Sequence, residues 1–357
     1  MDLARVRPRR ARWAVPAGLV AAVGIVIGGS AIGGGAQAAP RLPARSTAQL
    51  LAAVDGPAPP PMTGVVRQTA SLGLPDLPGS SDPLSPLSLL SGSHTFDVWY
   101  DGPTRVRVAV PVSLGETDLR RDGRDVWLWD SKTNQATHYV LPAAAETPAQ
   151  GTQTGVPAPQ ALAQQALAAV GPTTTVGLQQ NVTVAGQAAY QLSLAPKDSR
   201  SLVGQVRIAI DARDSAPLRV QVFARGAASP AVDVGFTSLS FGVPAASNFT
   251  FAPPPGAKLK TVTVPAGSGG SRPGAPAPPR FVGKGWLSVA VLPSVPADES
   301  GGIVGALQSA ATPVQGSWGS GRLLRTSLLS VLITSGGQIL AGAVQPSVLY
   351  ADAAQLT

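Results

Sequence analysis

The stretch LRRDGRDVWLWDSKTNQATHYVL, residues 119–141, decides the fold class. Its Asp122-Gly123 dipeptide favours a tight hairpin turn, because glycine adopts positive φ at little cost, and a run rich in valine and tryptophan follows it. A second β signal, FTFAPPPG, occupies residues 249–256. The two segments together predict a mainly antiparallel β protein.

Segments on both sides of this hairpin alternate polar and apolar residues, as strands with one wet and one dry face do. Arg105, Val106, Arg107 and Val108 are an example. We therefore expect a one-layer antiparallel sheet that wraps around other parts of the chain. The predicted strands span residues 64–72, 95–101, 105–110, 117–121, 125–130, 136–141, 175–184, 188–195, 204–211, 218–224 and 233–241, with turn residues at 211–217.

Two helices are predicted within this β pattern. Ser46 and Gln49 form a capping box for a short helix at residues 47–54. A second helix at 159–170 has proline in its first turn and ends at Gly171-Pro172. Its apolar residues form one stripe that can face a sheet. They are Leu162, Ala166, Leu167 and Val170.

The first 40 residues carry an export signal. Five arginines precede the apolar stretch 14–32, and Ala36-Gln37-Ala38 fits a cleavage site before Ala39. We expect cleavage; the alternative is an uncleaved anchor, because roughly 20 apolar residues can cross a bilayer. Both alternatives place the body outside the cytoplasm, in the periplasm, in the cell-wall space or on the outer side of a membrane.

A linker separates the long β region from a small tail. Residues 265–280, PAGSGGSRPGAPAPPR, cannot bury a core. The tail is predicted to contain strands at 286–292, 323–334 and 338–344, with Gly336-Gly337 as a turn, and helices at 303–310 and 346–354. The predicted organisation is 1–38 signal peptide or anchor, 39–264 main domain, 265–280 linker and 281–357 small α+β domain.

Composition and motifs argue against an enzyme. The chain has no cysteine and two histidines, and it lacks the GxSxG, HExxH and Walker patterns. Net charge is +8, but much of it lies in the five arginines of the export signal, and no basic cluster with interleaved aromatics predicts nucleic-acid binding. We expect no cofactor and no metal site. Asp118, Asp122, Asp125 and Asp130 are spaced as turn residues, and His138 lies in a predicted strand.

Several motifs, in this order, resemble the LolA-like family of lipoprotein carriers. They are TGVVRQT at 63–69, FDVWYDGP at 96–103, the hairpin DGRDVWLWD, QATHYVL, and FTFAPPPGAKL from residue 249, within about residues 46–260. The resemblance implies a half-open β-barrel with a helical lid that holds acyl chains. It also implies a lid-latching arginine where this chain has Gly102, which puts a gated shuttle in doubt.

The insertion at 74–92 also departs from that family. Its Leu84, Leu87 and Leu90 recur at helical spacing, so the insertion is either a replacement lid or a loop that packs on the barrel rim. The linker and the tail resemble the arrangement of RseB (MucB) regulators, in which a second domain follows a LolA-like one.

We therefore expect a non-enzymatic protein that holds lipid or lipoprotein acyl chains in an apolar cavity. The alternative is an RseB-like sensor that acts on a membrane anti-sigma factor through residues 281–357; a structural role in the cell envelope is a third hypothesis. For each candidate residue, we expect a place in the packed core, away from any cavity, as much as a place on the cavity lining. The candidates are Val98, Tyr100, Val106, Val108, Trp127, Trp129, Tyr190, Leu192, Ile208, Val220 and Phe236 on strands, with Leu162 and Leu167 on the helix.

Overall fold

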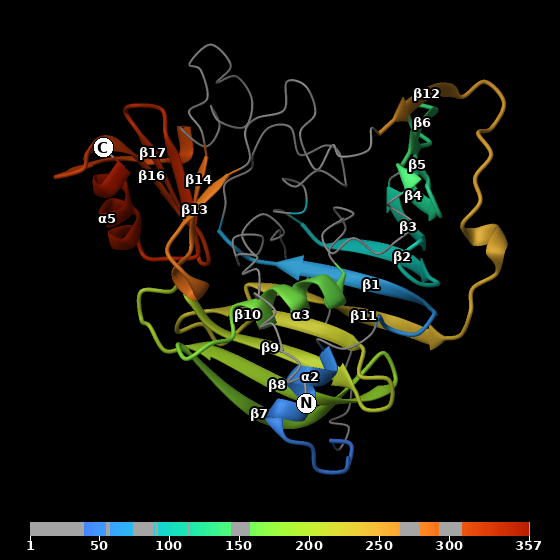
Figure 1. Ribbon diagram of the computed structural model, residues 1–357, viewed down its shortest axis with the longest axis horizontal. Helices are drawn as coiled ribbons and strands as arrows, with labels where there is room; N and C mark the ends of the chain where they lie inside the picture. Colours follow the sequence, from blue (N-terminus) through green and yellow to red (C-terminus); the bar gives the residue numbers. More distant parts are fainter. Residues whose placement is uncertain are drawn as a thin grey trace, which may run out of the picture.

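The computed structural model describes residues 39–54, 58–73, 89, 92–112, 114–143, 158–264, 279–292 and 309–356. The predicted export signal, almost all of the predicted linker, most of the predicted helix 303–310 and Leu84, Leu87 and Leu90 of the insertion lie outside these ranges. Within them, two β-sheets carry most of the ordered structure (Figure 1).

The larger sheet has twelve strands in the described ranges. Neighbouring strands are antiparallel except for the pair β12 and β6, which is parallel. In spatial order the strands are β12 (Lys258–Thr263), β6 (Gln135–Val140), β5 (Asp125–Asp130), β4 (Gly115–Asp122), β3 (Arg105–Val112), β2 (His94–Tyr100), β1 (Met62–Ala70), β11 (Val232–Phe241), β10 (Pro217–Ala224), β9 (Val203–Asp211), β8 (Gln187–Pro196) and β7 (Thr174–Val184).

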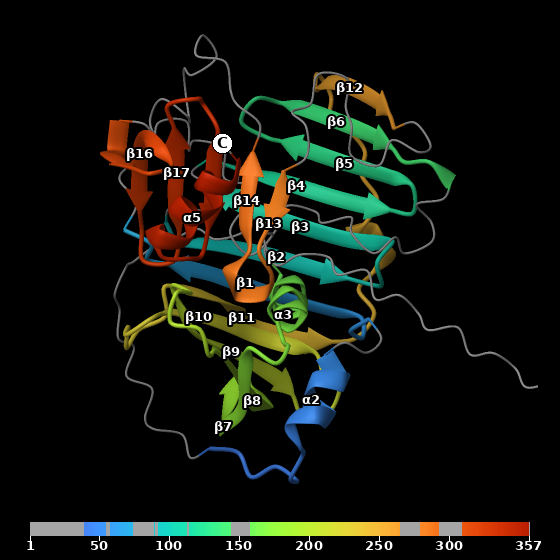
Figure 2. The ribbon, with the colours of Figure 1, turned by 60° about the vertical axis from the view of Figure 1, so that its left-hand side comes forward.

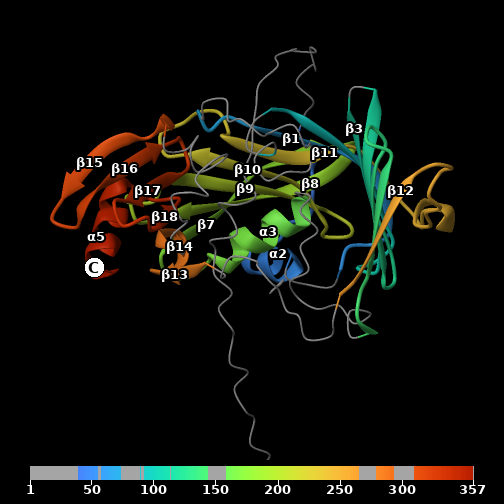
Figure 3. The ribbon, with the colours of Figure 1, turned by 90° about the horizontal axis from the view of Figure 1, so that it is seen from above.

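This sheet curves around two helices without closing. From above, β3 to β6 form one wall, and α2 (Thr47–Val54) and α3 (Pro159–Ala168) lie inside the curve (Figure 3). The described strands end at β12 on one side and β7 on the other. The predicted fold class, a mainly antiparallel half-open barrel with helices in its concave face, is confirmed.

The local turn signals correspond to turns in the structure. Gly123 has φ +60° between β4 and β5, and the Asp211 carboxylate accepts hydrogen bonds from the backbone N–H groups of Arg213 and Asp214 after β9. The capping box is also present, because Ser46 and Gln49 exchange side-chain to backbone hydrogen bonds of 2.8 and 3.2 Å.

FTFAPPPG is not a strand. Residues 249–256 follow the short 3₁₀ helix η3 (Ala246–Asn248) as an irregular extended segment, and the last strand, β12, begins only at Lys258. Three consecutive prolines remove the N–H donors that a ladder needs, which explains the error. In Figure 3 this segment lies outside the wall β3–β6, on the face opposite α3.

The main core fills the concave face. Leu162, Ala163 and Ala166 of α3 are buried in one apolar cluster with residues of β1 to β3 and β8 to β11, such as Leu192 of β8, and with Leu50 of α2. The apolar face of helix α3 therefore holds it against the sheet.

The second sheet is antiparallel throughout and packs against α5 (Pro346–Leu356); Figure 2 brings this part of the molecule forward. The stretch predicted as one strand at 323–334 is two strands joined by a tight turn at 326–329. The apolar pattern of this stretch continues through the turn and therefore did not indicate it. In spatial order its strands are β13 (Arg280–Val282), β14 (Val289–Leu292), β18 (Ile339–Gly342), β17 (Ser330–Thr334), β16 (Gly319–Arg325) and β15 (Thr312–Gly316).

The two sheets contact each other directly. Trp286, in the 3₁₀ helix η4 (Gly285–Leu287), donates a buried 2.8 Å hydrogen bond from Nε1 to Oγ1 of Thr174, at the start of β7. Leu202 N–H donates to the Ala343 carbonyl at 2.9 Å. Trp286 and Leu328 both belong to the main apolar cluster of the large sheet. The tail is therefore packed into the core of the half-barrel; the predicted domain boundaries themselves stay a prediction.

Candidate functional site

Helix α3 positions an apolar cavity against the concave face of the large sheet. Proline at the first helical position suits the start of a helix, because its missing N–H would have had no partner there. The first turn of α3, from Pro159 to Ala161, lines the cavity together with residues of β1, β2, β3 and β11.

The cavity has a volume of about 240 Å³. An engineered apolar cavity of about 150 Å³ holds one benzene, and pockets for drug-sized ligands begin at about 300 Å³. The volume therefore suits part of one aliphatic chain. The lining residues are Pro59, Met62, Val66, Phe96, Val98, Tyr100, Val106, Val108, Ala158, Pro159, Gln160, Ala161, Gln164, Ala216, Pro217 and Phe236.

Five of the predicted cavity residues lie on this lining. They are Val98 and Tyr100 of β2, Val106 and Val108 of β3, and Phe236 of β11.

Six further candidates point into the same concave core without lining the cavity. Leu167 is partly buried and packs against the core, whereas the other five are buried within it. These five are Leu162, Tyr190, Leu192, Ile208 and Val220.

Trp127 and Trp129 of β5 are on the other face of the sheet, contrary to the prediction. Strand pairing places Trp127 beside Arg120 and His138, whereas Leu128 continues the row that contains Val108. The Trp127 ring stacks on His138 at 4.1 Å between centroids, and both tryptophans contact the ring of Phe251. Trp127 and Trp129 therefore pack on the convex face of the wall formed by β3 to β6.

The sequence prediction missed the β1 residues of the lining, although their signal was available. Met62, Val66 and the buried Gln68 alternate along β1 and share the concave face. Phe96 lies two residues before Val98 on β2, so both side chains point to the same face, and Phe96 is fully buried. Gln160 and Gln164 were missed because only the apolar stripe of the helix was expected to face the sheet, and neither glutamine belongs to that stripe.

Gly64 makes room for one lining side chain. A Cβ added to Gly64 would lie 2.9 Å from Cδ1 of Phe236, so only glycine allows this ring to lie across β1. Gly102, where the resemblance implied a latching arginine, is in the turn after β2 with φ +84°. Glycine adopts that conformation without strain.

The described lining residues carry no charged side chain. Burial, and to a smaller extent the negative charge of Asp101, raises the pKa of the Tyr100 hydroxyl above its usual value. This hydroxyl therefore stays protonated at neutral pH. Across the described residues, no three His, Asp or Glu side chains lie close enough together to hold a metal ion.

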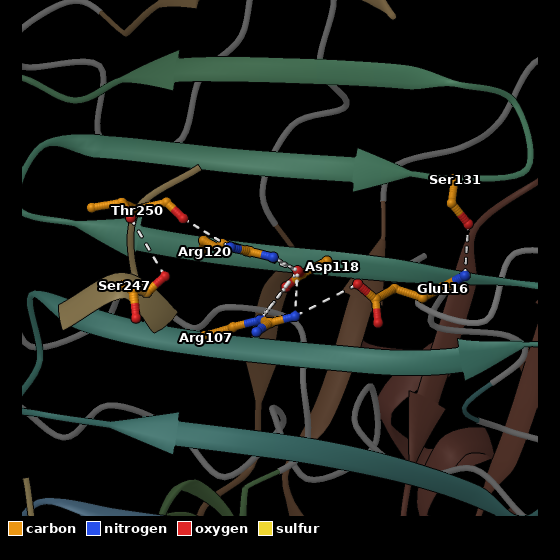
Figure 4. Close-up of polar contacts among 7 residues, drawn as sticks. All are labelled: Arg107, Glu116, Asp118, Arg120, Ser131, Ser247 and Thr250. Carbon is orange, nitrogen blue, oxygen red and sulfur yellow. Dashed lines mark hydrogen bonds and ion pairs between the residues drawn. The ribbon is translucent and has the colours of Figure 1, made fainter. Parts of the chain in front are cut away.

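An ionic cluster on the convex face fixes the segment that follows β11. The fully buried carboxylate of Asp118 pairs with Arg107 at 2.9 Å and with Arg120 at 2.6 Å (Figure 4). Arg120 also donates from Nη1 to the Thr250 carbonyl at 2.8 Å, and its guanidinium lies over the Phe251 ring. Asp118 is therefore a structural anion and not the turn residue that its spacing predicted.

Two shallower pockets lie elsewhere on the surface. One, of about 450 Å³, is lined by polar and apolar residues of β7 to β10 together with Ala39 and Pro40. The other, of about 370 Å³, includes Arg67, Arg219 and Asp233. Separately, no helix in the described ranges is both long enough and apolar enough to cross a bilayer.

No protein-family model and no curated protein matches the chain. Among solved structures, the Pseudomonas aeruginosa MucA/MucB complex matches over 86% of this chain and 95% of that one, with 15% identity and a TM-score of 0.42. An uncharacterized conserved protein from Thermus thermophilus matches over 61% of this chain and 100% of that one, with 14% identity and a TM-score of 0.33.

A LolA superfamily protein from Nitrosomonas europaea also matches, over 58% of this chain and 99% of that one, with 11% identity and a TM-score of 0.21. Proteins of both predicted groups, LolA-like and MucB, are thus among the structures that match. At these TM-scores, the description of the fold rests on the topology of this chain's own sheets.

Proposed function

We propose that this protein is an exported, non-enzymatic binding protein that holds one aliphatic chain of a lipid or lipoprotein in the cavity beneath α3. The observation that supports it is the uncharged, mostly apolar lining of that cavity. Each ligand methylene that enters an apolar site contributes about 0.8 kcal/mol, so one chain supplies useful affinity without specific polar contacts. The charge-free apolar stretch before residue 40 supports an extracytoplasmic location.

A pair of alanine substitutions in α3 tests this proposal. Ala161 lines the cavity, and Ala168 lies exposed at the far end of the same helix. Ala161→Phe fills the cavity from its helical side, so we expect it to lower the affinity for a fluorescent alkyl probe at least about tenfold. Ala168→Phe, the matched control, leaves the affinity unchanged. Absence of saturable binding by the unmodified protein, or equal binding by both variants, contradicts the proposal.

A sensor that passes the state of the cavity to a membrane partner is the second candidate. Its support is the packing of Trp286, from η4, and Leu328, from the turn between β16 and β17, into the same apolar cluster as α3. Packed cores transmit changes in volume, so filling the cavity strains both groups together. On this proposal the tail, residues 281–357, binds an anti-sigma factor or a comparable membrane protein.

Crosslinking in cells tests the sensor proposal. A photo-reactive residue at Phe281, which is 37% exposed on β13, reports what the tail contacts. A discrete membrane partner whose crosslink changes in Ala161→Phe and not in Ala168→Phe supports a sensor. The same crosslinks in both variants, or no membrane partner, contradict it.

A further inference from the structure

Gln160 brings a hydrogen-bonding group to a cavity that is otherwise mostly apolar. It is the second residue of α3 and lines the cavity. Its Oε1 is buried and has no hydrogen-bond partner within the part of the chain that the structure describes. A buried polar atom without a partner is costly, so a bound molecule gains affinity by supplying one.

Tyr100 is a second polar group on the lining. Its hydroxyl both donates and accepts hydrogen bonds while it is protonated. The nearby charge that acts on this hydroxyl is the negative charge of Asp101. The carboxylate of Asp101 pairs with Arg105 at 3.0 Å.

One cation lies in strand register beside the lining residue Val106 but is directed away from the cavity. Arg121 of β4 pairs in register with Val106, and its Nε donates to the Gly123 carbonyl at 3.0 Å, at the end of the hairpin. Arg121 is not among the residues that line the cavity. The lining therefore offers hydrogen bonds without a counter-ion for a charged head group.

We infer that the ligand is a single aliphatic chain whose head group is neutral and both donates and accepts hydrogen bonds, an amide or a hydroxyl. Its head lies against Gln160 and Tyr100, and its chain lies among residues such as Val66, Phe96 and Val108. Such a head satisfies the Gln160 amide in either orientation of that amide. This inference rests on the proposed function and narrows it to one class of ligand.

A carboxylate head fits these groups poorly. At neutral pH it brings acceptors only, so it cannot donate to Oε1 of Gln160, and the lining offers it no positive charge. An ammonium head brings donors only and loses its water without an anion on the lining.

Binding of three dodecyl ligands to the full protein tests the inference. Dodecanamide, dodecan-1-ol and dodecanoate have chains of equal length and differ in the head group. Native mass spectrometry or displacement of a fluorescent alkyl probe at pH 7.5 gives each affinity. We expect the amide and the alcohol to bind about tenfold more tightly than the carboxylate.

Two substitutions in α3 separate the head-group contact from general hydrophobicity. Gln160→Leu is expected to lower dodecanamide affinity about three- to tenfold, the effect of one neutral hydrogen bond, and to leave dodecanoate affinity unchanged. Gln165→Leu is the matched control, because Oε1 of Gln165 is also buried without a partner in the described structure and Gln165 does not line the cavity.

The outcomes are distinguishable. Failure of all three ligands and of the probe to bind contradicts the proposed function and the inference with it. Tighter binding of dodecanoate, or an equal effect of Gln160→Leu and Gln165→Leu on dodecanamide, overturns the inference while the binding function stands. Loss of amide affinity in Gln160→Leu alone supports it.

Discussion

Gly64 on β1 lies directly beneath the ring of Phe236 on β11, close enough that one added methyl group would be 2.9 Å from Cδ1 of the ring. The added Cβ would also be 2.6 Å from the backbone carbonyl oxygen of Ser238. The absence of a side chain at position 64 thus lets β1 and β11 pair while the ring of Phe236 lines the cavity.

Gly64→Ala should therefore destabilise the protein and displace Phe236. We expect a loss of about 1–3 kcal/mol in the free energy of unfolding, because a backbone carbonyl cannot give way. Denaturant unfolding measures the loss, and the affinity for an alkyl probe reports the change in the lining. Gly171→Ala is the control, because an added Cβ there meets nothing within 4 Å. Equal stability of the two variants would show that the position of the Phe236 ring does not require glycine at residue 64.

Asp118→Asn should lower the free energy of unfolding more than most substitutions at the surface do. The substitution keeps the shape of the side chain but leaves Arg107 and Arg120, which are 15% and 17% exposed, without their shared anion. We expect a loss of about 3 kcal/mol in the free energy of unfolding. Glu116→Gln is the control, because Glu116 is 42% exposed and 3.6 Å from Arg107, so its loss should stay within about 0.5 kcal/mol. A similar effect of the two changes would contradict a buried role for Asp118.

Phe251→Ala should loosen the segment that crosses the convex face. It removes ring contacts with Trp127 and Trp129, with centroids 5.2 and 5.8 Å away. We expect a loss of about 2 kcal/mol, a red shift of tryptophan emission and faster amide exchange in β12. Leu259→Ala on β12, where the side chain is 57% exposed, should change stability by less than about 0.5 kcal/mol. Unchanged amide exchange in β12 would show that the packing of Phe251 does not stabilise the pairing of this strand.

The pKa of Asp198 provides a test by titration. Side-chain and backbone hydrogen bonds from Arg200 lower it to about 2. A carboxylate with a lowered pKa stabilises the fold above its unfolded-state value of about 4, and that contribution is lost as the pH falls towards 2. Arg200→Gln removes the side-chain hydrogen bond and keeps the backbone one, so it should raise the pKa part of the way towards about 4, as measured by NMR of the carboxyl carbon. A pKa that stays near 2 in this variant would exclude the side chain of Arg200 as the main cause.

Sequence patterns identified the strands better than the faces of the strands. Alternation assigned Val106 and Val108 to one face of β3 and Trp127 and Trp129 to one face of β5, and both assignments are correct within each strand. Which face of β5 continues that of β3 depends on the register across β4. Because the side-chain period is two, an error of one residue exchanges the faces.

The remaining errors have local physical causes. The segment beginning at Phe249 carries two aromatics typical of strands, but the prolines after Ala252 prevent ladder pairing. Gln160 was missed because a polar helical residue is expected to face water. Its position beside a cavity follows only from where α3 lies on the sheet.

The parallel pairing of β12 with β6 has a consequence for the order of folding. Thr263 pairs with Val140, so more than a hundred residues must emerge and β7 to β11 must be made before this edge receives its last strand. Pairings between distant segments form slowly because the chain between them must first be ordered. Until β12 arrives, β6 is therefore an unpaired edge strand that can pair with another chain, and the pairing with β12 removes that hazard.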